Sequence, residues 1–322
     1  MSTEKQVPWI EKYNPKNLSE IYGNPNIIDR LKNILVSNNL SNMIISGPSG
    51  TGKSCCVKCL VQELLNEYTK EAILELNGSD DRGINIIRVS IKSFAQKKLI
   101  LEKGKYKIII LDEADSITVG SQQALRRIIE NFSKTTRFIF VCNILNKIIE
   151  PIQSRCTMLK FEKLKKNDLF SKLEYICQNE KINYTKSGLE LISQISYGDM
   201  RQAIGNLQNT YYCSKIINKK SIFEICNIPL TYLLKDFVKI CLNNDFKKVS
   251  KLLSENFNSG FSLDDIINTL FYLVRTNNFI SEVNRIEFIK EISVSGININ
   301  DGVDGIIPIY SIASRLCEIN QK

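Results

Sequence analysis

The sequence of 322 residues contains no histidine and is poor in two further residue types, with 15 glycines and 7 prolines. Without an imidazole, the protein has no histidine-containing zinc site, no Ser-His-Asp triad and no imidazole acid or base. The low glycine and proline content, together with 43% hydrophobic residues, excludes a collagen-like or disordered chain. Any catalysis must therefore use carboxylates, lysine, arginine, backbone groups or a bound metal.

Two kinds of long apolar segment are also lacking. The N-terminus has no apolar secretion signal, and no apolar run of about 18 residues is free of charge. We therefore expect a soluble intracellular protein with no membrane segment. Its ten cysteines are expected to be reduced and to serve mostly as small core residues.

Positive charge is in excess, with 43 Lys and Arg against 34 Asp and Glu and a net charge of +9. Residues 228–322 carry ten basic and eleven acidic side chains, so the whole excess lies in the first 227 residues. A basic surface that binds a partner is therefore expected in that part of the chain.

Hydrophobic patterning predicts the fold class and three domains. Short apolar runs alternate with amphipathic segments between residues 42 and 143, which predicts an α/β domain, residues 1–160, with a parallel sheet covered by helices. The expected strands are Met43–Ser46, 71–76, 106–111 and 137–142, with a further run after Cys156, and the expected helices are 54–66, Ile84–Gln96 and 121–132. Beyond about Phe161 the strand signals stop. A small helical domain is expected at 161–227 and an all-helical domain at 228–322, with helix boundaries at Thr185 or Ser187 and at Gly198-Asp199.

The segment from Ser46 to Ser54 matches the phosphate-binding pattern GxxxxGK[ST] and lies between an expected strand and an expected helix. In such a loop the glycines let backbone N–H groups face phosphates, and the helix adds its positive N-terminus. Lys53 would reach the β- and γ-phosphates, and the Ser54 hydroxyl would ligate Mg²⁺. The alternative, a chance match in an ordinary loop, is disfavoured by the strand-loop-helix context.

Polar residues end the next apolar runs. Asp112 is suited to hold Mg²⁺ and Glu113 to polarise a water toward the γ-phosphorus, although acidic residues also favour the first turn of a helix. Asn143 follows the next run, at the edge where open α/β sheets bind ligands; alone, it would be taken as a turn residue. Arg155 and Arg201, taken alone, would be surface or salt-bridging residues.

The order of several motifs resembles the small subunits of replication factor C, which are AAA+ ATPases of the eukaryotic sliding-clamp loader. The motifs are PWIEKY at 8–13, GPSGTGKS at 47–54, NGSDDRG at 77–83, LDEAD at 111–115, QQALRR at 122–127, SRC at 154–156 and GDMRQA at 198–203. The resemblance implies an ATPase that opens the clamp and loads it at primer-template DNA during replication and repair in the nucleus. It implies assembly into a hetero-pentamer with other loader subunits through a C-terminal collar domain.

The resemblance also implies roles for individual residues. It assigns Asn143 as sensor 1, Arg201 as sensor 2 and Arg155 as an arginine finger that acts in trans on a neighbouring subunit. With Lys53, Asp112 and Glu113 these form the implied catalytic set, and Ser54 and Asp112 would hold Mg²⁺. The residues implied to bind ATP are Ile10, Tyr22, Gly47, Pro48, Ser49, Gly50, Thr51, Gly52, Lys53, Ser54, Cys55, Asn143 and Arg201.

The sequence departs from the family pattern at two positions near the expected site. Asn14 stands where the family usually has arginine, and Ser49 where it usually has proline. The first change would weaken a contact near the nucleotide or the subunit edge, whereas the second lies at a variable position of the loop. Cys55, Cys56 and Cys59 lie on one expected helix without a fourth ligand, so we interpret them as a buried helix face and not a zinc site.

Basic residues are concentrated between residues 82 and 107, where eight of them stand against one acid, Glu102. Arg88 and Lys92 lie four apart and share a face of the expected helix, which suits contacts to phosphates of any sequence. The resemblance favours DNA tracking by Arg82, Arg88 and Lys92, and a solvated helix face is the alternative.

Residues from Phe94 to Leu101 lie where the resemblance places the contact with the sliding clamp, although core packing explains part of this apolar segment equally well.

The sequence leaves two other functions open. Another AAA+ machine, such as a junction-migrating helicase, would translocate along DNA, whereas a loader hydrolyses a few ATP and releases. A scaffold subunit that binds ATP without turnover is disfavoured by the presence of Lys53, Glu113, Asn143 and Arg201.

Overall fold

The computed structural model describes residues 7–65, 69–79, 84–99, 102, 105–225, 229–256, 262–276, 280–303, 305 and 307–319. The chain divides into two compact units, Met1–Lys219 and Lys220–Lys322. The first contains the sheet together with the helices that follow it up to Lys219. The finer division into three domains stays a prediction.

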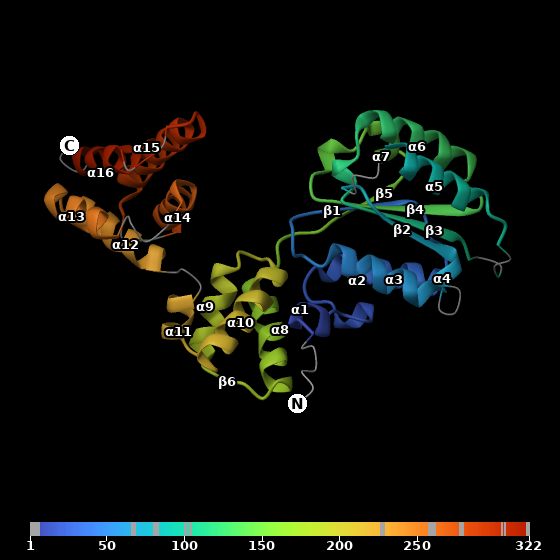
Figure 1. Ribbon diagram of the computed structural model, residues 1–322, viewed down its shortest axis with the longest axis horizontal. Coiled ribbons are helices and arrows are strands. Elements are labelled where there is room, and N and C mark those ends of the chain that lie inside the picture. The colour runs from blue at the N-terminus through green and yellow to red at the C-terminus, as the bar shows by residue number, and fades with distance from the viewer. Residues whose placement is uncertain are drawn as a thin grey trace. The chain divides into compact units, whose positions relative to one another are not determined.

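A five-stranded sheet lies within the first unit, with its strands in the order β2-β3-β4-β1-β5 (Figure 1). The strands are β1 (Met43–Ser46), β2 (Ile73–Asn77), β3 (Lys107–Asp112), β4 (Thr136–Cys142) and β5 (Thr157–Lys160). Neighbouring strands are parallel throughout. The segments that follow β1, β3 and β4 therefore open at one edge of the sheet, which is where the polar residues of the motifs were expected.

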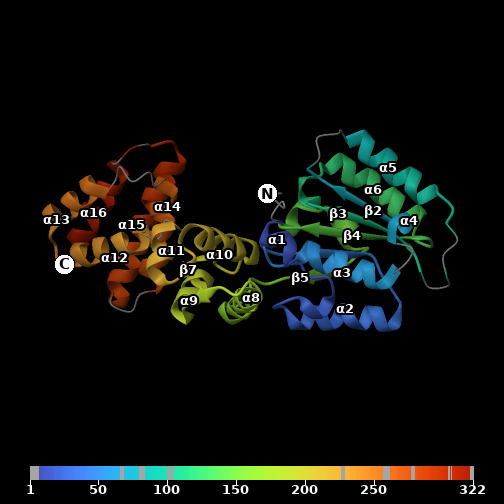
Figure 2. The ribbon, with the colours of Figure 1, turned by 60° about the horizontal axis from the view of Figure 1, so that its bottom comes forward.

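Both faces of the sheet are buried, because alternate strand residues enter two separate apolar clusters. One cluster joins Ile45, Ile110 and Ile139 to helices α2 (Pro25–Ser37) and α3 (Lys53–Leu65). The other joins Ile44, Ile109 and Phe140 to α5 (Ile84–Gln96) and α6 (Val119–Asn131). Figure 2 shows the two helix layers on either side of the strands. The α/β class, the order of elements and the two covered faces are as predicted.

Two details differ from the predicted elements. The strand expected at 71–76 begins only at Ile73, because Thr69–Ala72 form a helical turn, α4. The region after Phe161 is not purely helical, since β6 (Asn183–Tyr184) and β7 (Ile216–Ile217) form a parallel pair. Two-residue strands are too short to give a periodic signal.

The helices that follow the sheet are α8 (Lys166–Asn179), α9 (Lys186–Ile195) and α10 (Met200–Ser214). Helices α9 and α10 begin at the predicted cap residues. The Thr185 side chain accepts a hydrogen bond from the N–H of Gly188, and the Asp199 side chain accepts one from Gln202. Each cap satisfies a backbone donor that the first turn leaves without a helical partner.

The N-terminal segment is fastened to this helical part by a short helix, α1 (Trp9–Lys12). The backbone N–H of Trp9 donates to Oε1 of Gln208 at 3.0 Å. The centroid of the Trp9 ring lies 5.5 Å from the centroid of the Tyr211 ring. The Tyr13 hydroxyl donates to Glu180, the residue that follows the last turn of α8, at 2.5 Å. Since α10 begins at the sheet edge, these contacts bring the residues around α1 to the same place.

The second unit has its own apolar core. Its helices are α12 (Pro229–Leu242), α13 (Phe246–Asn256), α14 (Leu263–Thr276), α15 (Glu282–Asn300) and α16 (Ile307–Ile319), preceded by α11 (Lys219–Ile225) at the boundary. Phe237, Phe288 and Leu316 are fully buried in that core. None of the helices within the described ranges combines the length and the hydropathy that a membrane span requires.

Candidate nucleotide-binding and hydrolysis site

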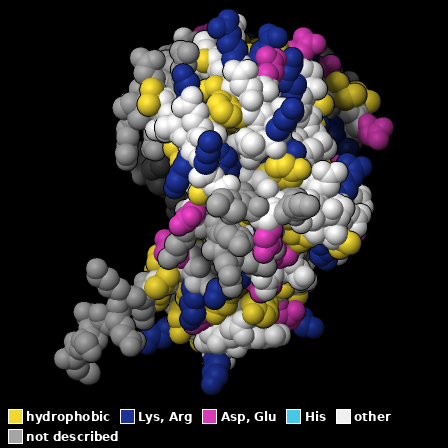
Figure 3. Space-filling model, turned by 90° about the vertical axis from the view of Figure 1, so that its right-hand side faces the viewer, with side chains coloured by type: hydrophobic (Ala, Val, Ile, Leu, Met, Phe, Trp, Pro, Cys, Tyr) yellow, Lys and Arg dark blue, Asp and Glu magenta, His cyan; other side chains and the backbone are white. Residues whose placement is uncertain are grey.

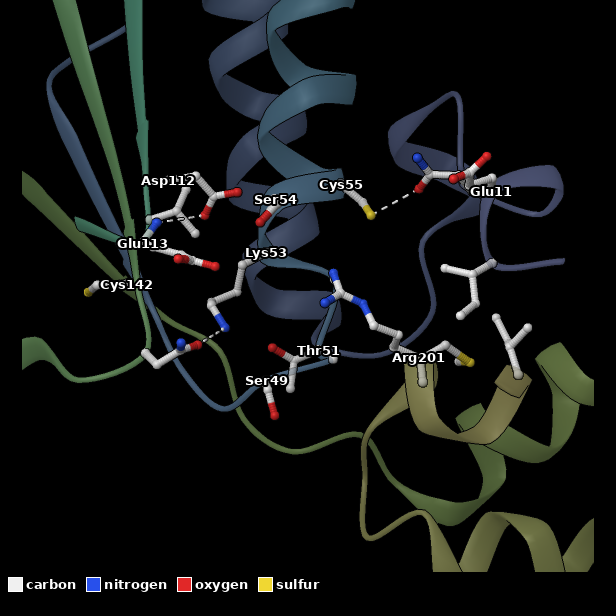
Figure 4. A pocket seen from close by; sticks show the side chains of 18 residues that line it. Glu11, Ser49, Thr51, Lys53, Ser54, Cys55, Asp112, Glu113, Cys142 and Arg201 are labelled. Atoms are coloured by element: carbon white, nitrogen blue, oxygen red, sulfur yellow. Dashed lines mark hydrogen bonds between the residues drawn. The ribbon is translucent and has the colours of Figure 1, made fainter. Parts of the chain in front are cut away.

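A cavity of about 310 Å³ lies between the carboxyl edge of the sheet, the phosphate loop, the first turn of α10 and the segment around α1 (Figure 4). It is lined by Ile10, Glu11, Asn14, Ser49, Gly50, Thr51, Gly52, Lys53, Ser54, Cys55, Asp112, Glu113, Val141, Cys142, Asn143, Met200, Arg201 and Ile204. Most residues that the sequence assigned to ATP, and the two carboxylates, therefore meet at one cavity.

Lys53 begins helix α3 and is almost completely buried. Its Nζ donates to the carbonyls of Gly47 and Pro48, at 2.8 and 2.7 Å, and to Oδ1 of Asn143, at 2.9 Å. Burial lowers the pKa of Lys53 below its usual value. A phosphate anion placed beside this ammonium would offset the desolvation, because an opposite charge favours the protonated form.

The phosphate loop is joined directly to the start of α10. The hydroxyl of Ser49 donates to Oδ2 of Asp199 at 3.2 Å, and the N–H of Met200 donates to the carbonyl of Gly50 at 2.9 Å. Gly50 has φ +64°, and a Cβ there would stand 1.8 Å from Oδ1 of Asp199. The left-handed φ favours glycine at this position, and a side chain there would also displace the Asp199 carboxylate.

The two carboxylates leave the end of β3 in a constrained turn. Oδ1 of Asp112 accepts a hydrogen bond from the N–H of Glu113 at 3.0 Å, and Glu113 itself has the left-handed φ of +49°. Such a conformation is uncommon for a residue with a side chain and concentrates at functional sites. Oδ2 of Asp115, two residues on, accepts from the N–H of Ile144 at 3.3 Å, which links this turn to the segment carrying Asn143.

The oxygen groups fit a magnesium ion bound together with phosphates. Ser54 and Asp112 line the same cavity and offer a hydroxyl and a carboxylate oxygen, the ligand type that Mg²⁺ prefers. No group of three or more metal-ligating Asp, Glu, Cys or His side chains occurs in the described part of the chain. Mg²⁺ commonly takes only one or two protein ligands and completes its shell with waters and substrate phosphates.

The side of the cavity away from the sheet is lined by apolar side chains and one positively charged side chain, Arg201. Ile10, Met200 and Ile204 line it, and the guanidinium of Arg201 points into the cavity in Figure 4. At its edge, the Cys55 thiol donates to Oδ1 of Asn14 at 3.0 Å. Burial raises the pKa of Cys55, so the group is a neutral thiol at physiological pH.

The sequence missed several lining residues. Ile204 stands three residues after Arg201, so helical spacing could have shown that it shares a face with that residue. Glu11 gave no comparable signal, and Asn14 was noted only as a departure from the family pattern near the nucleotide, since the place of both at the cavity depends on how α1 packs against α10. The cysteine interpretation is confirmed for Cys56 and Cys59, which are buried in the core, while Cys55 faces the cavity.

Three residues assigned to ATP do not line the cavity. Gly47 and Pro48 contact Lys53 through their carbonyls instead. Tyr22 lies elsewhere, with Nζ of Lys172 5.3 Å from its ring centroid, and burial raises the pKa of its hydroxyl. The role of Tyr22 at the nucleotide stays a prediction.

Arg155 is also away from this cavity. It precedes β5 and lies at the amino edge of the sheet, where its Nη2 pairs with Oε1 of Glu130 at 2.7 Å. The four residues of β5 span about 13 Å at about 3.3 Å per residue, so a strand length separates Arg155 from the opposite edge.

The basic region between residues 82 and 107 is described in part. Lys92 is exposed on α5, whose inner face carries the buried Ile91. Arg82 lies outside the described residues, and Arg88 lies on α5 with its side chain outside them. Lys and Arg side chains gather on the upper part of the face seen in Figure 3.

The segment from Phe94 to Leu101 belongs partly to the core. Ala95 is buried, and Phe94 and Leu99 pack against the two sheet clusters, so core packing accounts for its described apolar residues. Lys97 and Lys98 are exposed, and residues 100 and 101 lie outside the described part. The clamp contact stays a prediction.

The site defines the class of protein. A phosphate loop with a buried lysine, followed by carboxylates and an asparagine at neighbouring strand ends, is the machinery of a P-loop ATPase. Residues 43–163 match the ATPase family associated with various cellular activities (AAA). The RuvB Holliday junction branch migration motor of Thermotoga maritima shares this fold, with TM-score 0.57 and 18% identity over 82% of this chain and 91% of that one.

Within this class, the chain belongs to the replication factor C family. Residues 229–315 match the replication factor C C-terminal domain, and residues 1–82 match the Rad17 P-loop domain. The chain is 44% identical to the probable replication factor C subunit 2 of Dictyostelium discoideum, over 98% of this chain and 94% of that protein. It is also 44% identical to replication factor C subunit 4 of Saccharomyces cerevisiae, over 98% of each chain. The protein is an ATPase subunit of the sliding-clamp loader, as the motifs indicated.

Proposed function

We propose that this chain binds ATP with Mg²⁺ in the cavity at the sheet edge and hydrolyses it within a hetero-pentamer of loader subunits in the nucleus. ATP binding would let the assembly open the sliding clamp, and primer-template DNA would trigger hydrolysis and release. One observation carries the proposal: Lys53, the Asp112-Glu113 pair, Asn143 and Arg201 converge on a single cavity.

The residues divide the chemistry among them. Lys53 and the loop N–H groups hold the β- and γ-phosphates, and Arg201 adds a second positive charge from α10. Ser54 and Asp112 would hold Mg²⁺, which when bound neutralises phosphate charge. The carboxylate of Glu113 orients the attacking water and accepts its proton, which requires the anionic form of that side chain.

Asn143 has two tasks in this arrangement. Its Oδ1 already fixes the ammonium of Lys53 at 2.9 Å, which leaves the NH₂ group of the amide to meet a γ-phosphate oxygen or the water. Because Asn143 directly follows β4, the position of its backbone is set by the sheet. A phosphate bound by Lys53 would therefore also contact or displace the amide of Asn143.

Hydrolysis in an assembly is supported by the place of Arg155. A strand length separates it from its own cavity, so its guanidinium serves a nucleotide held by an adjacent subunit. Arginine fingers supplied in trans raise turnover by roughly 10³–10⁵. The ATPase sites are then complete only at subunit boundaries, which makes turnover depend on assembly.

DNA and clamp contacts follow from the exposed basic face of α5. Lys92 is exposed on α5, and Arg88 precedes it by four residues on the same helix. We propose that the two residues contact phosphates of any base sequence. Arg82 extends the same basic segment in the sequence. The clamp contact would use the end of α5 and the residues up to Leu101.

The experiment is reconstitution of the complete complex, with ATP turnover measured for this chain alone and for the complex with and without clamp and primer-template DNA. We expect very slow turnover alone and strong stimulation by both partners together. Equal turnover of the isolated chain and the complex would contradict the proposal. Processive movement along DNA without clamp loading would indicate a translocating motor instead.

A further inference from the structure

A glutamate stands where helix electrostatics disfavour it. Glu130 is the second-last residue of α6 (Val119–Asn131), and the C-terminal end of a helix carries the negative end of the helix dipole. An acidic side chain in the last turn is therefore repelled by its own helix. Nearby cations would offset this repulsion, and the structure places two arginine side chains beside Glu130.

Two guanidinium groups meet the same carboxylate oxygen. Nε of Arg126, one turn earlier on α6, donates to Oε1 of Glu130 at 3.1 Å, and Nη2 of Arg155 lies 2.7 Å from that oxygen. These contacts lower the pKa of Glu130, with the hydrogen bond from Arg126 the largest cause. The carboxylate is therefore ionised at physiological pH, and the three groups together keep a net positive charge.

The Arg155 guanidinium is held on two sides. Its Nη1 donates to the carbonyl of Pro151 at 2.7 Å and to Oγ of Ser154 at 3.2 Å, while Nη2 faces Glu130. A guanidinium has five N–H groups. Within the described part of the chain Nε of Arg155 donates to no acceptor, so Nε–H and one N–H of Nη2 stay available for an anion.

We propose that Glu130 is a positioning residue for Arg155: with Arg126 behind it, it fixes the guanidinium so that its free N–H groups face the triphosphate of an adjacent subunit. This rests on the proposed action of Arg155 in trans. Arg155 is 36% exposed and Glu130 40% exposed, so the group lies at the surface where a neighbouring subunit can approach. A side chain as long as arginine loses much rotamer freedom when it binds, and prior fixation by Glu130 removes part of that loss from the reaction.

The alternative role for the same contact is restraint, in which Glu130 holds Arg155 back from the phosphate. Arg126 argues against it, because a carboxylate shared between two guanidiniums neutralises only one of them. The cluster therefore presents a positive charge to the neighbour's nucleotide and not a neutral pair.

The test uses the complete reconstituted complex. The neighbouring subunit whose site Arg155 would serve keeps its own glutamate, and the other partner subunits carry the equivalent of Glu113→Gln. Glu130→Gln in this chain removes the charge and keeps the shape, and Arg155→Ala removes the finger. Glu75→Gln is the matched control, because Glu75 forms an exposed ion pair with Lys58 at 2.6 Å on the first unit. Single-turnover and steady-state hydrolysis by the neighbouring site are measured over a range of ATP concentrations.

We expect Glu130→Gln to lower the neighbour's kcat by roughly tenfold to a hundredfold, the effect of misplacing a catalytic group. The neighbour's KM, ATP binding by this chain and its unfolding midpoint should stay at the values of Glu75→Gln. Glu130→Asp should recover part of the lost turnover. A larger loss is expected for Arg155→Ala.

Each contrary outcome has a separate meaning. An unchanged or faster neighbouring site in Glu130→Gln, together with a collapse in Arg155→Ala, would overturn the role of Glu130 and leave the trans finger intact. Parallel losses of the unfolding midpoint and of this chain's own ATP binding would show a structural role and also overturn it. A neighbouring site insensitive to Arg155→Ala would overturn the proposed trans action itself.

Discussion

The hydroxyl of Ser49 in the phosphate loop donates a hydrogen bond to Oδ2 of Asp199, 3.2 Å away and 150 residues later in the chain. The same carboxylate caps α10 through the N–H of Gln202 at 3.0 Å. Asp199 therefore joins the loop that holds the phosphates to the helix that carries Arg201. A proline at position 49 would have no hydroxyl to donate, so this bond depends on the serine.

This link predicts different effects for two substitutions. Asp199→Ala loses the helix cap and the bond to Ser49, so the first unit should lose about 1 kcal/mol or somewhat more in free energy of unfolding. Ser49→Ala removes only one exposed hydrogen bond and should cost less. ATP affinity should fall several-fold in Asp199→Ala, because Arg201 is no longer fixed beside the loop.

The matched control is Thr185→Ala, which removes the equivalent cap of α9, where the side chain accepts from Gly188 at 3.2 Å. It should lose similar stability in urea unfolding and keep normal ATP affinity by calorimetry. If Thr185→Ala weakened ATP binding as much as Asp199→Ala did, the loss would come from general destabilisation.

Gly50→Ala should weaken ATP binding. The added Cβ would stand 1.8 Å from Oδ1 of Asp199, and the left-handed φ of +64° disfavours any side chain. Gly120→Ala is the contrasting change, because no atom lies within 4 Å of a Cβ at that helical position. It should leave binding normal and raise stability by roughly 0.5–1 kcal/mol. Equilibrium ATP binding of both variants checks this, and normal affinity of Gly50→Ala would refute the loop geometry.

ATP should protect Cys55 from alkylation, because its thiol lines the cavity. Its raised pKa leaves less thiolate at pH 8 than an ordinary cysteine has, so labelling should be slow there and accelerate as pH rises toward that pKa. The exposed Cys213 is the internal control, because ATP should not change the rate at which it is labelled. Peptide mass spectrometry after timed alkylation measures both sites. Equal labelling of Cys55 with and without ATP would show that nucleotide does not cover it.

Alanine at both Arg88 and Lys92 should weaken DNA binding of the whole complex equally for unrelated primer-template sequences. The slope of log affinity against log salt should shrink by up to about two units, since each lost duplex phosphate contact removes about 0.9. The matched control replaces Arg30 and Lys32, which are exposed on α2 at the opposite face of the sheet. An unchanged slope with normal loading would identify the α5 face as merely solvated.

Sequence patterns were sufficient for the sheet and for the residues at its edge. Asp112 ends β3, Asn143 follows β4, and Lys53 follows β1 after the phosphate loop; parallel strands bring these positions to one edge without further information. Asp199 was predicted only as a helix boundary, and its bond to Ser49 was not predicted, because that contact depends on how α10 meets the loop. Asn14 was recognised only as a departure from the family, since its place beside Cys55 requires α1 to dock on α10 through Trp9.

The contacts of Glu130 likewise could not be predicted in full from the sequence. Its spacing from Arg126 predicts a helical ion pair, which by itself contributes little. Only the fold brings Arg155, from a separate segment, to the same oxygen. Sequence spacing describes contacts within one helix, whereas contacts between segments need the packed structure.

The most direct measurement of the central claim compares ATP binding and ATP turnover in Glu113→Gln within the reconstituted complex. The substitution removes the carboxylate that orients water and leaves Lys53 and the phosphate loop unchanged, so ATP affinity should stay near normal while single-turnover hydrolysis at this site falls by at least about 10²-fold. Lys53→Ala should instead weaken ATP binding itself, because it removes the buried ammonium. Hydrolysis at the normal rate in Glu113→Gln would contradict the assignment of this cavity as a hydrolytic site.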